Sequence, residues 1–251
     1  MTTSVDPRWT YDTLASSYDL RPDYSAPLVE KVLDSTGIEP MSRVLEVGAG
    51  TGKFTAHLCR HGWDVTAIEP SAPMRAHALA KPALAGVRWI AAIGESLPIR
   101  NDSMRLIAYA SSFNCVESGS AMREARRVLT SDGQLLTLWN YRDLDDPLQR
   151  EVESIIASHI PLYDPGSRRV APMDHPLVHT LFDTMRIAEA RFVVDVIAVD
   201  WIVAWSAHGT VVRQAGDRMP AIVDDIRSLV SDRTSLSIPY ITRMWIAAVR
   251  R

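Results

Sequence analysis

The chain has 251 residues, of which 47% are hydrophobic and 23% charged, and its formal net charge is −3. This length fits one large domain, or one domain with a sizeable insertion. The lack of a basic excess argues against a nucleic-acid partner, and no basic amphipathic run indicates a membrane surface. Residues 1–10 lack the apolar segment of a signal peptide, no segment resembles a membrane-spanning helix, and two cysteines are too few for a disulfide framework. We therefore expect a cytoplasmic enzyme.

Apolar runs alternate with helical patterns through the first 140 residues. Residues 10–37 predict a short helical lead, a turn at Arg21 and Pro22, and a helix that ends at Gly37. Strands are predicted over 44–47, 63–69, 87–92, 105–110 and 133–139, and helices over 52–61, 71–81 and 120–129. Ser71 is the expected N-cap of the second of these helices. Near-continuous apolar strands separated by helices indicate a parallel sheet that is covered on both faces.

The pattern becomes irregular after about residue 140. Residues 141–188 are mixed and punctuated by prolines, 189–201 predict a strand, 202–230 are mainly helical, and 239–250 predict the last strand. We expect the last two strands to close the sheet. The prediction is a single domain over 1–251, with an N-terminal cap over 1–37, a core over about 38–140 and 190–251, and substrate-lid insertions over about 141–188 and 200–232.

The segment RVLEVGAGTGKFT, residues 43–55, places a glycine-rich turn between a strand and a helix. Its glycines follow a G-x-G-x-G spacing, and Lys53 stands where a dinucleotide-binding loop has its third glycine. Glu46 lies near the end of the first strand, where a carboxylate repels a pyrophosphate but accepts hydrogen bonds from an ammonium group. Glu69 ends the second strand, where a carboxylate can bind both hydroxyls of a ribose. This pattern favours a nucleoside that carries an amino acid instead of phosphates.

These residues and several later segments resemble class I S-adenosylmethionine (SAM)-dependent methyltransferases. LEVGAGTG and AIEPSAPM are similar to the family's first and second motifs, and GESLPIRNDSMRLI resembles its adenine-side loop. EARRVLTSDGQLL resembles the family's helix–turn–strand segment, and LASSYDLRPDY its N-terminal segment that closes over the cofactor. ASSFNC and WNYRD are similar to segments of a small-molecule subgroup that reads AQAFHW after strand four. The resemblance covers residues 11–145. It implies a Rossmann-like α/β fold: a mostly parallel seven-stranded sheet, helices on both faces and a helical lid insertion.

The resemblance also implies SAM as the cofactor and S-adenosylhomocysteine (SAH) as the product. The glycine loop and Glu46 are expected to hold the methionine half, and Arg21 to pair with its carboxylate. Glu69 is expected to bind the ribose, and Met74 to lie against the adenine. Ile93 replaces an aspartate of many relatives, which leaves a backbone contact or Glu95 for the adenine amino group. The expected cofactor-binding residues are Tyr18, Arg21, Glu46, Gly48, Ala49, Gly50, Gly52, Glu69, Pro70, Met74, Ile93, Gly94, Glu95 and Ser111.

Asn114 stands where relatives with the FHW sequence carry a histidine. Because an amide takes no proton near neutral pH, Asn114 is expected to orient the acceptor by hydrogen bonds. Where a base is needed, the candidates are His175, His179 and His208 in the expected lid. Cys115 is interpreted as a small buried residue, because methyl transfer from a sulfonium needs no enzyme nucleophile.

A helix carries His57, Cys59 and His61 at a nominal metal-binding spacing. No third ligand accompanies the two histidines in the pattern, so no metal is expected.

Together these features predict a methyltransferase that moves the methyl group of SAM to an oxygen, nitrogen or carbon nucleophile of a small molecule, largely by proximity and orientation. A secondary-metabolite acceptor is expected by analogy with the subgroup, and Arg142, Arg168 and Arg169 hint at an anionic one. The alternative is a SAM-binding enzyme that uses the sulfonium for a rearrangement or elimination without methyl transfer.

Other classes fit less well. A nucleic-acid methyltransferase is disfavoured because SSFNCV is not a proline-aromatic motif. The glycine spacing disfavours an NAD-dependent oxidoreductase. For the oligomeric state, the sequence is compatible with both a monomer and a homodimer.

Overall fold

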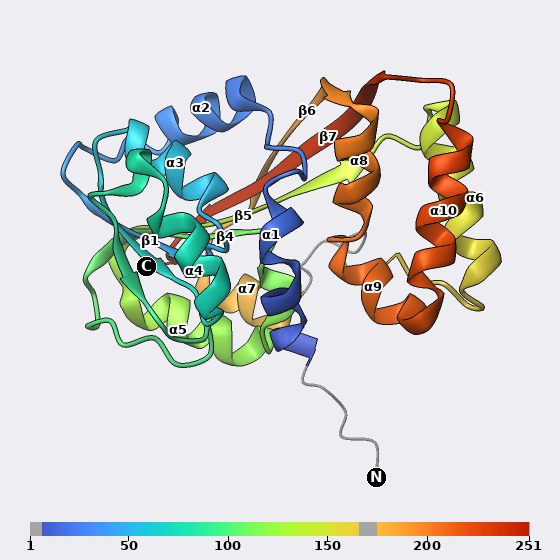
Figure 1. The fold of residues 1–251 in the computed structure, drawn as a ribbon. Helices are drawn as coiled ribbons and strands as arrows, with labels where there is room; N and C mark the ends of the chain where they lie inside the picture. The colour runs from blue at the N-terminus through green and yellow to red at the C-terminus, as the bar shows by residue number, and fades with distance from the viewer. Residues whose placement is uncertain (1–6, 166–174, 251) are drawn as a thin grey trace, which may run out of the picture.

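The computed structural model describes residues 7–165 and 175–250. These residues build an α/β fold around a seven-stranded sheet (Figure 1). The strands are β1 Arg43–Val47, β2 Asp64–Ile68, β3 Arg88–Ile90, β4 Met104–Ala110, β5 Leu129–Arg142, β6 Arg186–Ile197 and β7 Ser235–Ala248. Their order is β3-β2-β1-β4-β5-β7-β6, and β7 is antiparallel to both of its neighbours while β1 to β5 run parallel. The predicted mostly parallel, seven-stranded sheet is confirmed.

Helices cover both faces of this sheet (Figure 1). The α-helices of the described residues are α1 Ala15–Tyr18, α2 Ala26–Asp34, α3 Lys53–Arg60, α4 Ala72–Leu79, α5 Ser118–Val128, α6 Pro147–His159, α7 Pro176–Leu181, α8 Ala198–Trp205, α9 Gly209–Ala215 and α10 Met219–Leu229. Short 3-10 helices are η1 Pro7–Leu14, η2 Pro82–Leu84, η3 Phe113–Cys115 and η5 Gly216–Arg218. Ser71 caps α4 as predicted, because its side chain accepts a hydrogen bond from the Met74 amide.

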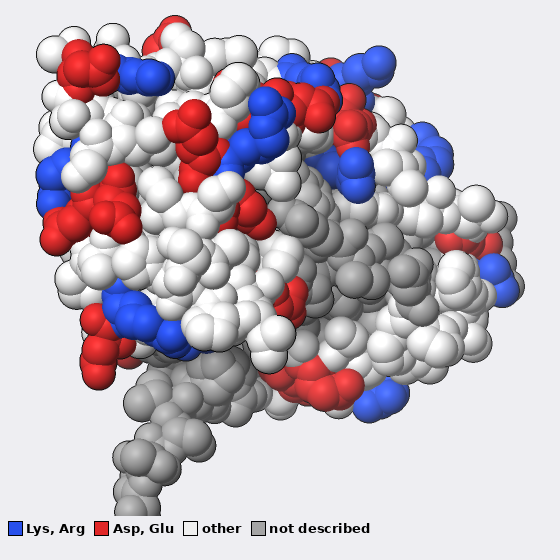
Figure 2. Space-filling view, turned by 90° about the vertical axis from the view of Figure 1, so that its right-hand side faces the viewer, with Lys and Arg blue, Asp and Glu red and all other residues white. Residues whose placement is uncertain are grey.

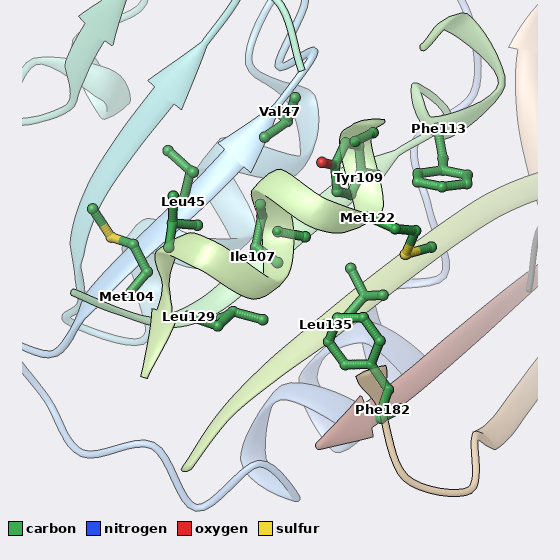
Figure 3. Close-up of a cluster of buried hydrophobic side chains, with 14 of the residues drawn as sticks. Leu45, Val47, Met104, Ile107, Tyr109, Phe113, Met122, Leu129, Leu135 and Phe182 are labelled. Carbon is green, nitrogen blue, oxygen red and sulfur yellow. The ribbon is translucent and has the colours of Figure 1, made fainter. Parts of the chain in front are cut away.

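The near-continuous apolar strands serve two cores, because successive side chains of a strand point to opposite faces. On one face Val44 packs with α2 and α3. On the other face Leu45, Ile107 and Leu135 lie beneath α5 and meet Met122 of that helix (Figure 3). The strands therefore need apolar residues at consecutive positions.

A third apolar core lies outside the main sheet. β7 pairs with β5 from Tyr240 onward and with β6 from Ser235 to Ile246, so residues 193–197 and 235–239 form a two-stranded ribbon. Helices α6, α8, α9 and α10 pack around this ribbon and form a separate lobe (Figure 1). The strand predicted over 189–201 ends at Ile197 instead, because the apolar run continues in α8, where Trp201 and Trp205 are one helical turn apart and face this core.

The outer surface of the molecule mixes charges of both signs. On the face shown in Figure 2, basic and acidic side chains lie beside one another. None of the helices in the described ranges has the length and apolar character that crossing a membrane requires.

Candidate functional site

The loop between β1 and α3 depends on glycine at three positions. Gly48, Gly50 and Gly52 have φ angles of +70°, +58° and +82°, the left-handed region that only glycine adopts readily. A Cβ atom on Gly48 would lie 2.5 Å from the Cβ of Ser112, and one on Gly52 would lie 2.4 Å from Cδ1 of Leu84. The backbone conformation therefore requires glycine at all three positions, and close packing gives a second reason for glycine at Gly48 and Gly52.

A cavity lies against this loop at the carboxyl ends of β1, β2 and β4, and we call it the loop cavity. Its empty space is about 740 Å³, including its opening to solvent. The strand order reverses between β1 and β4, which is where open α/β sheets bind ligands. The predicted cofactor residues that line it are Tyr18, Gly48, Gly50, Glu69, Pro70, Met74, Ile93, Gly94, Glu95 and Ser111.

A second cavity, the Glu46 cavity, has about 520 Å³ of empty space. It shares Tyr18, Gly48, Gly50, Ala110 and Ser111 with the loop cavity. The remaining predicted cofactor residues that line it are Arg21, Glu46 and Ala49. Gly52 lines neither cavity, so its contribution is the conformation of the turn.

Glu69 is held in one orientation by backbone amides. Its Oε2 accepts a hydrogen bond from the Gly50 amide and its Oε1 from the Ser71 amide, both at 2.8 Å. The residue is 6% exposed, and burial raises the pKa of Glu69 against the lowering effect of these hydrogen bonds. Each carboxylate oxygen keeps a lone pair for a further donor. The group can therefore accept two more hydrogen bonds at the wall of the loop cavity.

Glu46 is more deeply buried than Glu69. It is 1% exposed, and its Oε2 accepts a 2.6 Å hydrogen bond from the Thr55 hydroxyl. Burial raises the pKa of Glu46 to about 8, and the nearby Glu69 adds to the rise. A buried carboxyl that borders a cavity and has one neutral donor is a site for a cation, because a positive group would offset the cost of its ionisation.

A polar network attaches the N-terminal segment to the glycine loop. The ammonium of Lys53 donates to the backbone oxygens of Asp19 and Arg21, at 2.8 and 2.7 Å. Lys81 forms an ion pair with Asp19 at 2.8 Å and donates to the Thr51 carbonyl oxygen at 2.8 Å. Sequence reasoning missed these roles. In the sequence, Lys53 served only to show that the third glycine of a dinucleotide-binding loop is absent. No sequence spacing linked Asp19 to Lys81.

Ser111 lies where the loop and Glu46 cavities meet. It has a φ of +56°, which is unusual for a residue with a side chain and often marks a functional site. The hydroxyl of Tyr24 donates to its Oγ at 3.0 Å. Tyr24, which the sequence did not single out, therefore positions Ser111 from the N-terminal segment.

A third cavity, the Trp205 cavity, lies between the end of β5 and the helical lobe, with about 850 Å³ of empty space including its opening. It shares Arg21, Pro22 and Asn140 with the Glu46 cavity. Asn140 is fixed at this junction, because it donates to the Asp23 carbonyl oxygen at 2.8 Å and accepts from the Thr242 hydroxyl at 2.6 Å. The three cavities thus lie next to one another in a row, with the Glu46 cavity in the middle.

The Trp205 cavity is rich in aromatic rings. Its lining residues are Arg21, Pro22, Asn140, Tyr141, Arg142, Leu144, Tyr163, Pro165, Trp201, Ala204, Trp205, His208 and Tyr240. His208, the residue before α9, stacks on Trp205 with 5.3 Å between ring centroids and 16° between planes. Of the three candidate bases, His208 is the one that borders a cavity of the row.

The other catalytic candidates lie elsewhere. His179 lies on α7 and His175 is the N-cap of that helix, which packs against α5 on the flank of the sheet and not over the row of cavities as expected. The reason is the apolar face of α7, since Val178 inserts into the core beneath α5. His175 accepts a hydrogen bond from the Leu177 amide at 3.2 Å and so caps its own helix.

Asn114 borders none of the three cavities. Its Oδ1 accepts a hydrogen bond from the indole of Trp139 at 3.2 Å. The predicted orienting role of Asn114 therefore stays a prediction without a supporting contact. Cys115, expected to be buried, is half-buried and borders the loop cavity, with its Sγ 3.8 Å from the Tyr11 hydroxyl.

The remaining sequence candidates are also placed. Arg142 borders the Trp205 cavity and pairs with Glu153, whereas Arg168 and Arg169 lie outside the described residues. His57 and His61 each face a carboxylate, at 3.4 and 3.6 Å. Within the described ranges, no three side chains of the kinds that bind metals gather at one place.

The chain is similar to known methyltransferases in sequence. A family model described as a methyltransferase domain matches residues 45–137. An uncharacterised methyltransferase-like protein of Schizosaccharomyces pombe is 30% identical over 152 residues, which are 60% of this chain and 59% of that protein. An uncharacterised methyltransferase of Mycobacterium tuberculosis is 32% identical over 136 residues, 54% of each chain. The chain therefore matches between half and two thirds of the length of these relatives.

Solved structures share the fold over nearly the whole chain. A protein of Anaeromyxobacter dehalogenans described as a type II methyltransferase superposes with a TM-score of 0.60 at 18% identity, covering 92% of this chain and 97% of that one. Phosphoethanolamine N-methyltransferase 2 of Haemonchus contortus, solved with phosphomonomethylethanolamine and SAH, gives 0.57 at 12% identity and covers 96% of this chain and 58% of that one. At these identities the likeness concerns the fold.

Proposed function

We propose, from the premise that the chain belongs to the class I SAM-dependent methyltransferases, that it binds SAM in the loop and Glu46 cavities and transfers the methyl group to a small molecule in the Trp205 cavity. The accepting atom is an oxygen, nitrogen or carbon nucleophile. The observation that carries this proposal is the row of three neighbouring cavities that share lining residues, with two buried carboxylates at one end.

The residues of the first two cavities fit the parts of SAM. Glu69 offers free lone pairs to the two ribose hydroxyls, and Met74 and Ile93 offer apolar surface to the adenine. Glu46 offers a carboxylate to the ammonium group. Arg21 borders the same cavity and can bind the cofactor's carboxylate. A Cβ atom on Gly50 would have only Cε1 of Tyr18 within 4 Å, at 3.9 Å, so the loop backbone is open to close approach at this position.

When bound, SAM supplies an electrophilic methyl group on a sulfonium. The task of the chain is then to place the acceptor in line with the methyl–sulfur bond and to exclude water, which can account for much of the barrier lowering. Ser111 lines both the loop and Glu46 cavities, and Arg21 and Asn140 line both the Glu46 and Trp205 cavities, so they are positioned to orient the two reactants. Where the acceptor must lose a proton, His208 is the group in the Trp205 cavity that can take it.

Cofactor binding and turnover can be tested separately. Calorimetry should show saturable binding of SAM and SAH and no binding of NAD or NADP. Incubation with SAM and a panel of small phenols, amines and acids, some of them from secondary metabolism, should then yield SAH in an acceptor-dependent way. Saturable dinucleotide binding without SAM binding would overturn the proposal. SAH formation with an acceptor that is rearranged but not methylated would favour the non-methylating alternative.

A further inference from the structure

We propose that the acceptor is an aromatic carboxylate, a flat ring system with a negatively charged group, bound in the Trp205 cavity. This inference rests on the proposed function and deepens it, because it names the class of molecule that the third cavity recognises.

The walls of the cavity favour a flat ring. Trp201, Trp205 and Tyr240 are only 4%, 5% and 8% exposed, yet all three border the empty space. The rings of Trp201 and Trp205 lie at 88° with centroids 6.0 Å apart, so they form a corner. Arg142 and His208 lie against the Trp205 ring, so an aromatic ligand meets the small exposed part of the two indoles and of Tyr240, where edge-to-face contact between rings is favourable.

The charges of the cavity favour an anion. The described lining contains two arginines and no aspartate or glutamate. Arg142 is already paired with Glu153, and its guanidinium lies over the Trp205 ring at 5.3 Å. Arg21 contacts the ring of Tyr18 at 5.3 Å and makes no ion pair within the described residues. The cavity therefore carries a net positive charge at its junction with the cofactor site.

Arg21 can bind an acceptor carboxylate without giving up the cofactor. A guanidinium has five N–H donors in a fixed plane and binds a carboxylate with two of them. Lys53 also borders the Glu46 cavity, and two backbone carbonyl oxygens occupy only two of its three donors. The loop cavity shows the opposite character, since Glu69 and Glu95 are its only charged lining residues in the described ranges. Acidic groups thus line the loop cavity, the Glu46 cavity holds Glu46 beside Arg21 and Lys53, and the charged residues of the described Trp205 lining are basic.

Binding to the protein saturated with SAH tests this inference independently of turnover. The probes are benzoate, 4-hydroxybenzoate, 4-hydroxycinnamate and indole-3-acetate, each paired with its neutral amide, together with the saturated-ring counterpart of 4-hydroxybenzoate. Calorimetry should show at least one aromatic acid binding about tenfold or more tighter than both its amide and its saturated counterpart, as loss of a charge-assisted hydrogen bond implies. Equal binding of acid and amide, equal binding of aromatic and saturated rings, or no binding of any acid would overturn the inference.

Two variants assign the effect to the cavity. Trp205→Leu should reduce the preference for the aromatic ring, and Arg21→Gln should reduce the preference for the acid over the amide. Trp63→Leu is the matched control, because Trp63 is 8% exposed but packs in the core beneath α2 and α3. If Trp205→Leu does not fold, the ligand selectivity of the unmodified protein still decides the question. Failure of SAH itself to bind would overturn the proposed function, whereas SAH binding without acid selectivity would overturn only this inference.

Discussion

Glu46 is a buried carboxyl group, and replacing it with glutamine tests the electrostatics of the cofactor site. The substitution keeps the shape and an oxygen that can accept the Thr55 hydrogen bond. Burial raises the pKa of Glu46 from 4.5 to about 8. A group whose pKa is raised by folding contributes stability that is fully present below the unfolded-state value and is lost as pH rises through the folded-state value. Here that window runs from about 4.5 to about 8.

The size of the effect follows from the same values. At about 1.4 kcal/mol for each pKa unit, the ionised carboxylate destabilises the folded protein by about 5 kcal/mol in full, and about 2 kcal/mol of this is lost between pH 6 and pH 8. The free energy of unfolding should be measured in urea at pH 6 and at pH 8. Between these two values it should fall by about 2 kcal/mol less in Glu46→Gln than in the unmodified protein. Glu39→Gln, at an exposed carboxylate, is the control and should not change the difference. If Glu46→Gln follows the unmodified protein across this range, the buried carboxyl does not have the assigned pKa.

The pH dependence of ligand binding tests the ionisation of Glu46 independently of stability. If the ammonium of SAH binds ionised Glu46, its affinity should rise about tenfold between pH 6 and pH 7. Glu46→Gln should remove that rise. 5′-Methylthioadenosine has no amino-acid part, so its affinity should depend little on pH in either protein. A pH dependence that is the same for both ligands would place the ammonium away from Glu46.

Three further substitutions test other parts of the site. Glu69→Ala should weaken SAH binding by about 1.5–3 kcal/mol in a folded protein, the range for hydrogen bonds to a charged group; unchanged affinity in calorimetry would remove Glu69 from the ribose site. Gly48→Ala should lower the free energy of unfolding by about 1–3 kcal/mol, because φ is +70° and Ser112 occupies the space. Gly86→Ala, where a Cβ meets nothing within 4 Å, should have little effect. Lys53→Met should make the N-terminal segment more sensitive to limited proteolysis and should weaken the binding of SAH. A cleavage rate equal to that of the unmodified protein would show that the hydrogen bonds of Lys53 do not hold the segment.

The sheet and the grouping of the expected cofactor residues around the loop cavity were predictable because their signals are local. A strand, a glycine turn and a helix succeed one another within residues 43–60, Glu46 lies in β1, and Glu69 directly follows β2. Parallel strands bring their carboxyl ends to one edge, so residues from β1, β2 and β4 meet without any knowledge of side-chain packing. The predicted fold is confirmed on this basis.

The residues that meet at the Trp205 cavity, the proposed acceptor site, were not predictable for the opposite reason. Arg21, Arg142, Trp205 and Tyr240 come from four separate segments, and no spacing in the sequence connects them. The histidine spacing at 175 and 179 marks one face of a helix but does not say on which side of the sheet that helix packs. Its apolar residues decide the matter, since they join the core beneath α5. His208 gave no stronger signal in the sequence, and only the packing of α8 and α9 places it beside the cavity.

The distribution of charge along the row of cavities has a consequence for the reaction. Transfer from a sulfonium to an anionic nucleophile consumes one positive and one negative charge, so water stabilises the separated reactants more than the transition state. Walls that exclude water therefore help the reaction, provided that fixed groups first bring the anion in. Trp201 and Trp205 are nearly inaccessible to bulk solvent, while Arg21 stands at the entrance to the cofactor site. If the acceptor is the proposed aromatic carboxylate, Arg21 at the junction with the Glu46 cavity would attract the anion, and the aromatic lining of the Trp205 cavity would limit its hydration.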